Sequence, residues 1–286
     1  MKKLTVLMSA CLALAGCMHQ KLADGLSSDP AQTDSDGNVQ LAPFSAGASG
    51  SLPRGWKPLV LLRTKKKTDY RLVDEQDRVV LHARAAAASS GLIHEVNIDP
   101  ASRPWLHWSW KIKRLIASAD NTQQSAEDSP VRIVLAFDGD KEELPFADQM
   151  FFETAKLVTG HDFPYATLMY IWENREAVGT VIRNSRSSRV RMFVAASGPD
   201  GSGEWREFKR NIVEDYEKAF GEKPGRLIGV GVLTDTDNTG ETAEAWYGDI
   251  RLLPDEREQA TRSGASLPVG LEDQETRSHA SARRTQ

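Results

Sequence analysis

The sequence repeats one local pattern in many short segments, in which apolar and polar residues alternate. The clearest case is residues 105–115, whose even positions include Leu106, Trp108, Trp110 and Ile112. The same alternation recurs in residues 79–85, 131–137, 168–172 and 190–196, and two further strands are expected at 227–233 and 242–253. Successive side chains of a β-strand point to opposite faces, so each segment predicts a strand with one buried face.

Helical spacing occurs in fewer places. Ile212, Tyr216 and Phe220 recur every four residues, and Gly221 follows as a helix stop, which predicts a helix over residues 209–221. Residues 146–158 are a second candidate helix. Many short strands with few helices predict a mostly β chain, an antiparallel β-sandwich or jelly roll with one or two short helices.

The beginning of the chain has the features of an export signal. Lys2 and Lys3 precede an apolar stretch over residues 4–15 that is too short to span a bilayer. It ends in the sequence Leu-Ala-Gly-Cys at positions 14–17, which resembles the bacterial lipobox. We therefore expect residues 1–16 to be a lipoprotein signal peptide and Cys17 to carry the lipid anchor.

The rest of the chain divides by composition. Residues 17–50 are rich in small and polar residues, which predicts a flexible tether behind the lipidated cysteine. Residues 51–253 hold the β-sandwich domain, and residues 254–286 form a charged tail expected to be disordered. Cys11 leaves with the signal, so the mature domain has no free thiol. Met18, rather than aspartate, follows Cys17, which resembles lipoproteins sent to the outer membrane of the cell envelope.

Charge and motifs exclude several classes of function. The formal net charge is -4 and no basic block is present, so we expect no nucleic acid partner. The sequence holds no Gly-x-Ser-x-Gly, no His-Glu-x-x-His and no phosphate-binding glycine loop. We therefore expect a domain without catalytic activity, and the alternative is a glycan hydrolase that uses a carboxylate pair taken from Asp215, Asp235, Asp237 and Asp249.

Longer blocks of sequence resemble a known family. They cover residues 106–111, 170–172, 210–216, 220–224 and 229–240, within a region that runs from Leu52 to Leu253. This region resembles a family of exported bacterial proteins catalogued as a domain of unknown function. The resemblance implies a fold like that of galactose-binding jelly rolls, and it implies no reaction. Residues 245–252 are also similar to the last strand of many jelly-roll sugar-binding modules.

One acidic turn suggests a metal. Residues 235–241 place oxygen ligands at alternate positions and a glycine sixth, much as calcium loops do. The twelfth position is Trp246 instead of glutamate, which excludes an EF-hand. Asp235, Asp237 and Asp249 are therefore candidate ligands for a calcium cofactor. The alternative is an ordinary hairpin turn whose side chains bond their own backbone.

Aromatic residues suggest a sugar ligand. The chain has seven tryptophans, and flat aromatic rings pack against the apolar faces of sugars. Trp108, Trp110 and Trp172 share the apolar faces of their strands and are assigned to the core. Trp105, Trp205 and Tyr247 lie among polar or turn residues, so they are the candidates for an exposed platform.

Polar residues at the start of the predicted helix are a second ligand-binding candidate. Arg210, Asn211 and Asp215 could form the polar floor of a ligand cleft, with Asn211 and Asp215 on one helical face. The alternative is a helix cap together with a structural ion pair that fixes the helix on the sandwich. Together these patterns predict an anchored envelope lipoprotein that binds a glycan or another envelope ligand. A scaffold that binds an envelope protein remains a further alternative.

Overall fold

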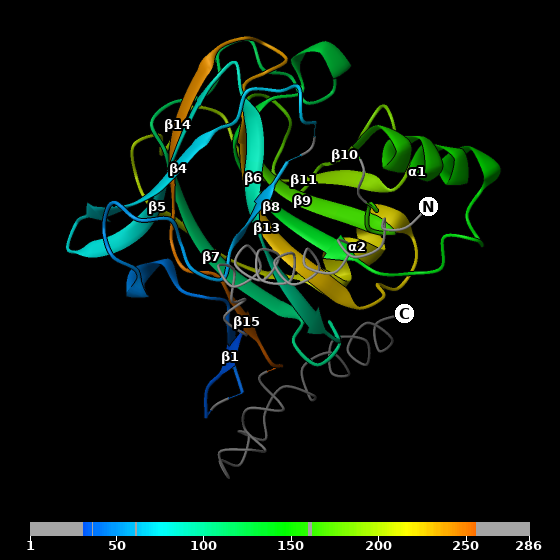
Figure 1. The fold of residues 1–286 in the computed structure, drawn as a ribbon, viewed down its shortest axis with the longest axis horizontal. Helices are drawn as coiled ribbons and strands as arrows, with labels where there is room; N and C mark the ends of the chain where they lie inside the picture. The colour runs from blue at the N-terminus through cyan, green and yellow to red at the C-terminus, as the bar shows by residue number, and fades with distance from the viewer. Residues whose placement is uncertain (1–30, 36, 61, 160–161, 256–286) are drawn as a thin grey trace, which may run out of the picture.

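The computed structural model describes residues 31–35, 37–60, 62–159 and 162–255 (Figure 1). These residues form two β-sheets packed face to face, with two α-helices beside them. The mostly β sandwich predicted from the alternation is confirmed. The predicted signal peptide, Cys17 and the tail from residue 256 onward lie outside the described residues. Within the described part of the chain, no helix is both long and apolar enough to cross a membrane.

The first sheet has eight strands. Its order is β1 (Gln32–Thr33), β2 (Val39–Gln40), β15 (Arg251–Leu253), β7 (Trp105–Ile112), β14 (Thr242–Tyr247), β5 (Arg78–Ala86) and β4 (Asp69–Glu75). The eighth strand, β12 (Arg206–Asn211), pairs with the edge of β7 that β14 and β15 leave free. Every pair in this sheet is antiparallel.

The second sheet has seven strands. Its order is β10 (Val181–Arg183), β11 (Val190–Ser197), β9 (Ala166–Glu173), β8 (Ser129–Phe137), β13 (Leu227–Asp235), β6 (Ser89–Ile98) and β3 (Lys57–Leu59). One pair, β9 with β11, is parallel, so the sandwich is not antiparallel throughout. Figure 1 shows this sheet beside the first, with α1 (Phe146–Thr159) at its outer margin near β10.

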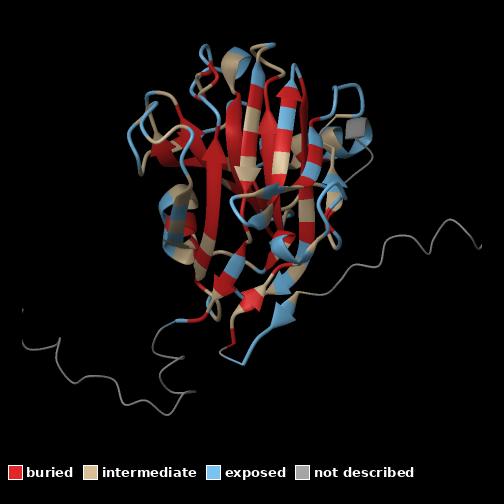
Figure 2. Ribbon diagram, turned by 90° about the vertical axis from the view of Figure 1, so that its left-hand side faces the viewer, coloured by how far each residue is buried: buried red, intermediate tan, exposed pale blue. Residues whose placement is uncertain are grey.

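The core lies between the sheets. Leu106, Trp108, Trp110 and Ile112 on β7 are all fully buried, as their alternation predicts. The Trp108 ring stacks on Tyr170 of β9 with a centroid distance of 4.8 Å, which joins the two sheets. Figure 2 shows that buried residues are concentrated in the strands. Burial of such large rings, each worth about 2 kcal/mol or more, holds the sheets together.

The helix predicted over residues 209–221 is confirmed from Ile212 onward, but its predicted start is wrong, because residues 209–211 belong to β12. α2 (Ile212–Phe220) begins after Asn211, whose side chain accepts hydrogen bonds from two backbone N–H groups of the first turn. It ends at Gly221, which has a left-handed φ of 76° that favours glycine. Two short 3₁₀ helices, η1 (Phe44–Ala46) and η2 (Gln124–Ala126), complete the fold.

The predicted boundary between tether and domain at residue 51 is wrong. Residues 32–33 and 39–40 form strands of the first sheet, and Leu41 and Phe44 are buried in the core. Phe44 also packs its ring 4.8 Å from Trp56. Strands of two residues are too short to show any periodicity, so composition alone assigned this segment to the tether.

Candidate functional site

The side chains of the first sheet that point away from the core form a mixed polar face, which we call the outer face. On β7 the core takes Trp108 and Trp110. Their neighbours His107, Ser109 and Lys111 therefore lie on the outer face. β5, β12 and β14 contribute side chains in the same way, because each pairs in register with β7 or with its neighbour. Residues that are distant in sequence meet on this face.

Strand register aligns a row of aromatic and basic side chains across the outer face. We call this row the aromatic ridge, and it consists of His82, Trp246, Lys111 and Trp205. Trp246 pairs with His82 on one side and with Lys111 on the other. The His82 and Trp246 rings stack with centroids 4.9 Å apart, and Lys111 Nζ lies 4.3 Å from the Trp246 ring. Trp246 is therefore held between two neighbours.

The ridge is fixed by charges as well as by stacking. Lys111 is only 8% exposed and forms an ion pair with Glu75 of β4. Burial lowers the pKa of His82, although its hydrogen bond to Glu244 opposes this effect. His82 is therefore neutral at pH 7 and stacks on Trp246 as an uncharged ring.

A hollow of about 180 Å³ opens beside the ridge, and we call it the Arg78 hollow. Its polar lining comes from four strands and the β14–β15 loop: Arg78, His107, Ser109, Glu207, Asp249 and Arg251. Gly248 forms part of its wall, and a Cβ atom at this position would lie 2.2 Å from Ser109 Oγ. Only glycine lets the chain pass so close to β7 between β14 and β15.

The charged groups around the Arg78 hollow differ in whether other residues of the chain already bind them. Asp249 accepts hydrogen bonds from the backbone N–H and the hydroxyl of Ser45, at 3.0 and 2.5 Å. The Arg78 guanidinium lies 4.1 Å from the centroid of the Trp205 ring. Among the described residues, neither Arg251 nor Glu207 has an ion-pair partner. The hollow thus offers both donors and acceptors to a ligand.

The three aromatic residues predicted to form a platform differ in exposure. Trp105 and Trp205 are partly exposed, and Lys209 Nζ lies 5.0 Å from the centre of the Trp105 ring. Tyr247 was assigned wrongly, because it is fully buried. Its hydroxyl donates to the Leu233 carbonyl at 2.8 Å and meets the Thr234 hydroxyl at 2.8 Å. Tyr247 joins the two sheets inside the core and cannot contact a ligand.

The polar floor predicted at the start of α2 is also wrong. Arg210 and Asp215 form an ion pair in which Asp215 is 4% exposed, and the Tyr170 hydroxyl donates to Asp215 at 2.7 Å. Asn211 uses its side-chain oxygen to cap the helix. These contacts support the alternative interpretation, a cap and an ion pair that fix α2 on the sandwich. The polar residues that suggested a ligand cleft therefore serve to fix the helix on the sandwich.

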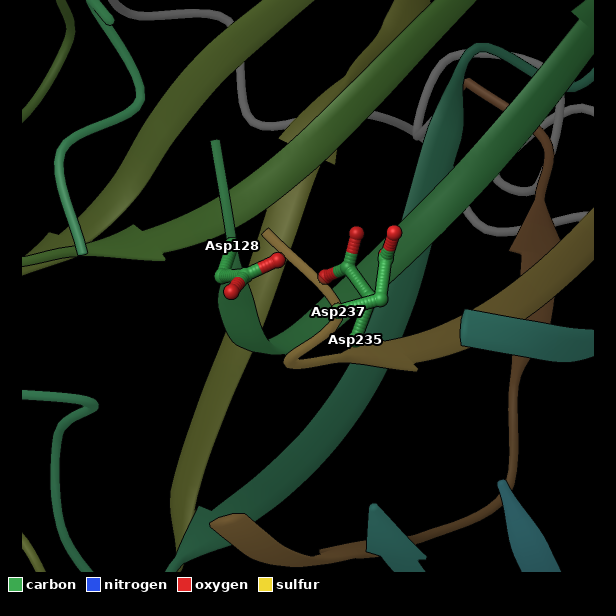
Figure 3. Close-up of side chains that lie close together, drawn as sticks. All are labelled: Asp128, Asp235 and Asp237. Atoms are coloured by element: carbon green, nitrogen blue, oxygen red, sulfur yellow. The ribbon is translucent and has the colours of Figure 1, made fainter. Parts of the chain in front are cut away.

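The three residues predicted to bind calcium do not lie together. Asp249 lies at the opposite end of β14 from Asp235, so it cannot complete that set. Asp128 takes its place: ligand oxygens of Asp128, Asp235 and Asp237 lie within 4.8 Å of one another (Figure 3). The turn after β13 is not a hairpin, because it leads from the second sheet to β14 in the first. The fully buried Asp128 accepts hydrogen bonds from the backbone N–H groups of Asn238 and Thr239.

This acidic cluster already contains basic partners from the chain. Asp237 pairs with Lys65, and Asp235 accepts a hydrogen bond from Arg132 Nε at 3.1 Å. Arg132 is 2% exposed and also donates to the side chain of Asn121. Burial raises the pKa of Asp235 to about 6, although the nearby Arg132 lowers it. The cluster therefore connects β8, β13 and the crossover as an ion-pair network.

Sequence reasoning named Trp205 and Asp249 but missed the other residues described on the outer face, and it did not place these two together. Trp246 was visible in principle, because Ala243, Ala245 and Tyr247 share the buried side of β14 and leave Trp246 on the other side. Glu207 and Asp249 had no such signal. They line the same hollow only because β12 and the β14–β15 junction lie on either side of β7.

Comparisons with known proteins identify the family. Residues 54–251 match the family described as a protein of unknown function, DUF3047. The chain belongs to this family. The resemblance to a family without an assigned activity is thereby confirmed. No curated protein matches the chain.

Two solved structures are similar to this DUF3047 chain at low identity. The K2 cleaved adhesin domain of Lys-gingipain gives a TM-score of 0.35 at 8% identity, covering 75% of this chain and 98% of that one. The family 30 carbohydrate-binding module of a cellulosomal cellulase from Clostridium thermocellum gives 0.34 at 10% identity, covering 77% and 98%.

Proposed function

We propose that this DUF3047 protein is an envelope lipoprotein whose β-sandwich binds a glycan on the outer face without changing it chemically. The observation that supports this most is the Arg78 hollow, which has unpaired donors and acceptors beside the aromatic ridge. Sugar hydroxyl groups donate and accept hydrogen bonds at once. A wall that mixes Arg251 with Glu207 satisfies both demands.

The aromatic ridge is expected to border the ligand with its ring edges, because most of its ring faces are not open for a sugar to stack on. Both sides of Trp246 are taken, by His82 and by Lys111. One side of Trp205 is taken by Arg78. Contacts from the arginine, histidine and carboxylate side chains of the hollow are therefore expected to carry the specificity, with ring edges adding apolar area.

The anchor is the second part of the proposal. Lipid on Cys17, with Met18 after it, would hold the domain at the outer membrane. A diacylated cysteine holds a protein on a bilayer far more firmly than a single acyl chain. A Cys17→Ser variant expressed in a Gram-negative host should no longer incorporate labelled palmitate. Palmitate labelling of that variant would reject the anchor.

A hydrolase is the alternative that the structure restricts. Asp215 and Asp235 are committed to buried ion pairs, whereas Asp249 lines the Arg78 hollow. Glu207 lines the same hollow. Release of reducing sugar from a bound glycan, lost in Glu207→Gln, would replace the binding proposal by glycoside hydrolysis.

Glycan-array binding tests the central part of the proposal. The chain from residue 18 to its end should bind at least one bacterial or plant polysaccharide. The double variant Arg78→Ala/Arg251→Ala should lose that binding. Lys57→Ala is the matched control, because Lys57 is a surface cation on the second sheet, paired with Glu95. Absence of binding to every polysaccharide, with capture of an envelope protein in crosslinked membranes, would favour the scaffold function.

The calcium hypothesis now concerns the cluster of Asp128, Asp235 and Asp237, whose existing cations argue against calcium binding. Carboxylate oxygens are the ligands that calcium prefers, but Lys65 already pairs with Asp237. Calcium binding would therefore have to displace this lysine. Thermal melting with and without calcium tests the prediction, as set out below.

A further inference from the structure

A second hollow lies on the outer face, on the other side of the aromatic ridge. It measures about 250 Å³, and we call it the Arg84 hollow. Its lining consists of Arg84, Lys113, Arg114, Thr242 and Glu244, with small alanines between them. Along β7, Ser109 borders the first hollow and Lys111 belongs to the ridge, and Lys113, directly after the strand, borders the second hollow. The ridge thus divides one continuous face into two hollows.

The two hollows differ in charge. The Arg78 hollow is lined by two arginines and two carboxylates, Glu207 and Asp249. The Arg84 hollow is lined by three cations and one carboxylate, Glu244. An excess of cations around small alanines favours an anionic group, whereas the balanced hollow favours neutral hydroxyl groups.

The single carboxylate of the Arg84 hollow is shared among its cations. Glu244 accepts hydrogen bonds from Lys113 at 2.8 Å, from Arg84 at 3.4 Å and from His82 at 3.0 Å. The Lys113 hydrogen bond is the main contact that lowers the pKa of Glu244, which therefore stays ionised. Arg114 donates to the Thr242 hydroxyl at 3.4 Å, and its charge also helps to lower the pKa of the nearby Glu241. The three cations that line the hollow still outnumber its one lining carboxylate, which favours an anionic ligand.

The spacing of the hollows suits an extended ligand. Lys113, the residue directly after β7, is four residues from Ser109, and Val80 and Arg84 are four apart on β5. At roughly 3.3 Å per residue, the centres are about 13 Å apart. An oligosaccharide spans this distance, and a single sugar ring does not.

We propose that the Arg84 hollow is an anion subsite that binds a carboxylate of an acidic polysaccharide whose neighbouring sugars occupy the Arg78 hollow. The proposal rests on the glycan-binding function above and adds the class of glycan. Guanidinium groups match carboxylates with paired hydrogen bonds, so Arg84 and Arg114 are the residues that select the acid. Lys113 adds a point charge.

A matched pair of polymers tests the subsite. Polygalacturonate and its fully methyl-esterified form have the same backbone, and only the first carries carboxylates. We expect the chain from residue 18 onward to bind polygalacturonate on the order of tenfold more tightly by isothermal titration calorimetry, because charge-assisted hydrogen bonds are lost in the ester. Raising the salt concentration should weaken binding of the acid form only.

Variants separate this proposal from the function on which it rests. Arg84→Ala/Arg114→Ala should lose the preference for the acid and keep the affinity for the ester. Arg78→Ala/Arg251→Ala should weaken the binding of both polymers. Lys57→Ala should change the binding of neither. Equal binding of both polymers by the unaltered chain would overturn the anion subsite and leave glycan binding intact. Binding to neither polymer, together with silence on a glycan array, would overturn both.

Discussion

Two groups of arginines in this molecule serve opposite purposes. Arg132, inside the cluster between β8 and β13, is 2% exposed and donates to Asp235, Asn121 and the Glu127 carbonyl. Arg251 and Arg114, on the outer face, are exposed, and the one hydrogen bond of Arg114 goes to a hydroxyl, that of Thr242. A buried charge must be satisfied within the fold, whereas an exposed charge beside a hollow is left for something else.

The same comparison applies to the acidic turn. Its residues suggested a metal site because oxygen ligands alternate along the turn and a glycine is sixth. The structure shows that those in the turn are occupied by Arg132, Lys65 and backbone donors. On the outer face, by contrast, Glu207 is exposed without an ion pair among the described residues. Unsatisfied groups indicate a site better than an abundance of charges does.

The largest effect on stability is expected from replacing Arg132, the buried arginine whose hydrogen bonds are made within the fold. Arg132→Met leaves Asp235 buried without its counter-ion, which should lower the free energy of unfolding by about 3–5 kcal/mol. Arg251→Ala should change it by less than about 0.5 kcal/mol. Urea unfolding followed by circular dichroism measures both. Equal losses in the two variants would remove the distinction between the two groups of arginines.

The pH dependence of Asp235 sharpens the same contrast. Burial raises its pKa to about 6, so the folded protein holds this proton more tightly than the unfolded chain does. The stability contributed by this proton is present below about pH 4 and is lost as the pH rises to about 6. The stability advantage of the unaltered chain over Asp235→Asn should therefore shrink by roughly 3 kcal/mol across this range.

Unfolding of the unaltered chain and of Asp235→Asn at a series of pH values supplies this comparison. A stability advantage that grows with pH would mean that Arg132, rather than burial, controls the pKa of Asp235. That result would mean that the attraction between Asp235 and Arg132 outweighs the cost of burying the Asp235 carboxylate.

A smaller effect is expected at Asn211, which lies near the outer face but serves the fold. Asn211→Ala removes the helix cap and should lower stability by about 1 kcal/mol. Asn211→Ser, which keeps a capping oxygen, should restore most of it. Glycan affinity should be unchanged in both variants, and a loss of affinity in Asn211→Ala alone would return Asn211 to the ligand site.

The smallest effect is expected from calcium. Because Lys65 and Arg132 already neutralise the acidic cluster, calcium should leave the Tm unchanged. A ligand that binds only the folded state raises the Tm by mass action. A rise that disappears in Asp237→Asn would show a metal site and would place the cluster among the functional regions.

The sequence predicted what depends on local pattern. Alternation in β7 identified Trp108 and Trp110 as core, and the spacing up to Gly221 identified α2. It assigned Tyr247 wrongly, because neighbouring polar residues were weighed above the parity shared with Ala243 and Ala245. Each of these outcomes could be decided within a single segment.

The candidate site depends on pairing between distant strands. Glu207 and Asp249 share a hollow through their positions on either side of β7. A shift of one residue in any of these registers would turn a lining side chain to the other face. Register between distant strands follows from the whole packed sandwich, so no local pattern in the sequence could have predicted this hollow.

The most direct test of the account is a titration of the best glycan from an array into the unaltered chain and into Arg78→Ala/Arg251→Ala, with urea unfolding in parallel. The account predicts that the double variant loses affinity on the order of tenfold or more and keeps its free energy of unfolding. Unchanged affinity in a fully folded double variant would contradict the assignment of the outer face as the binding site.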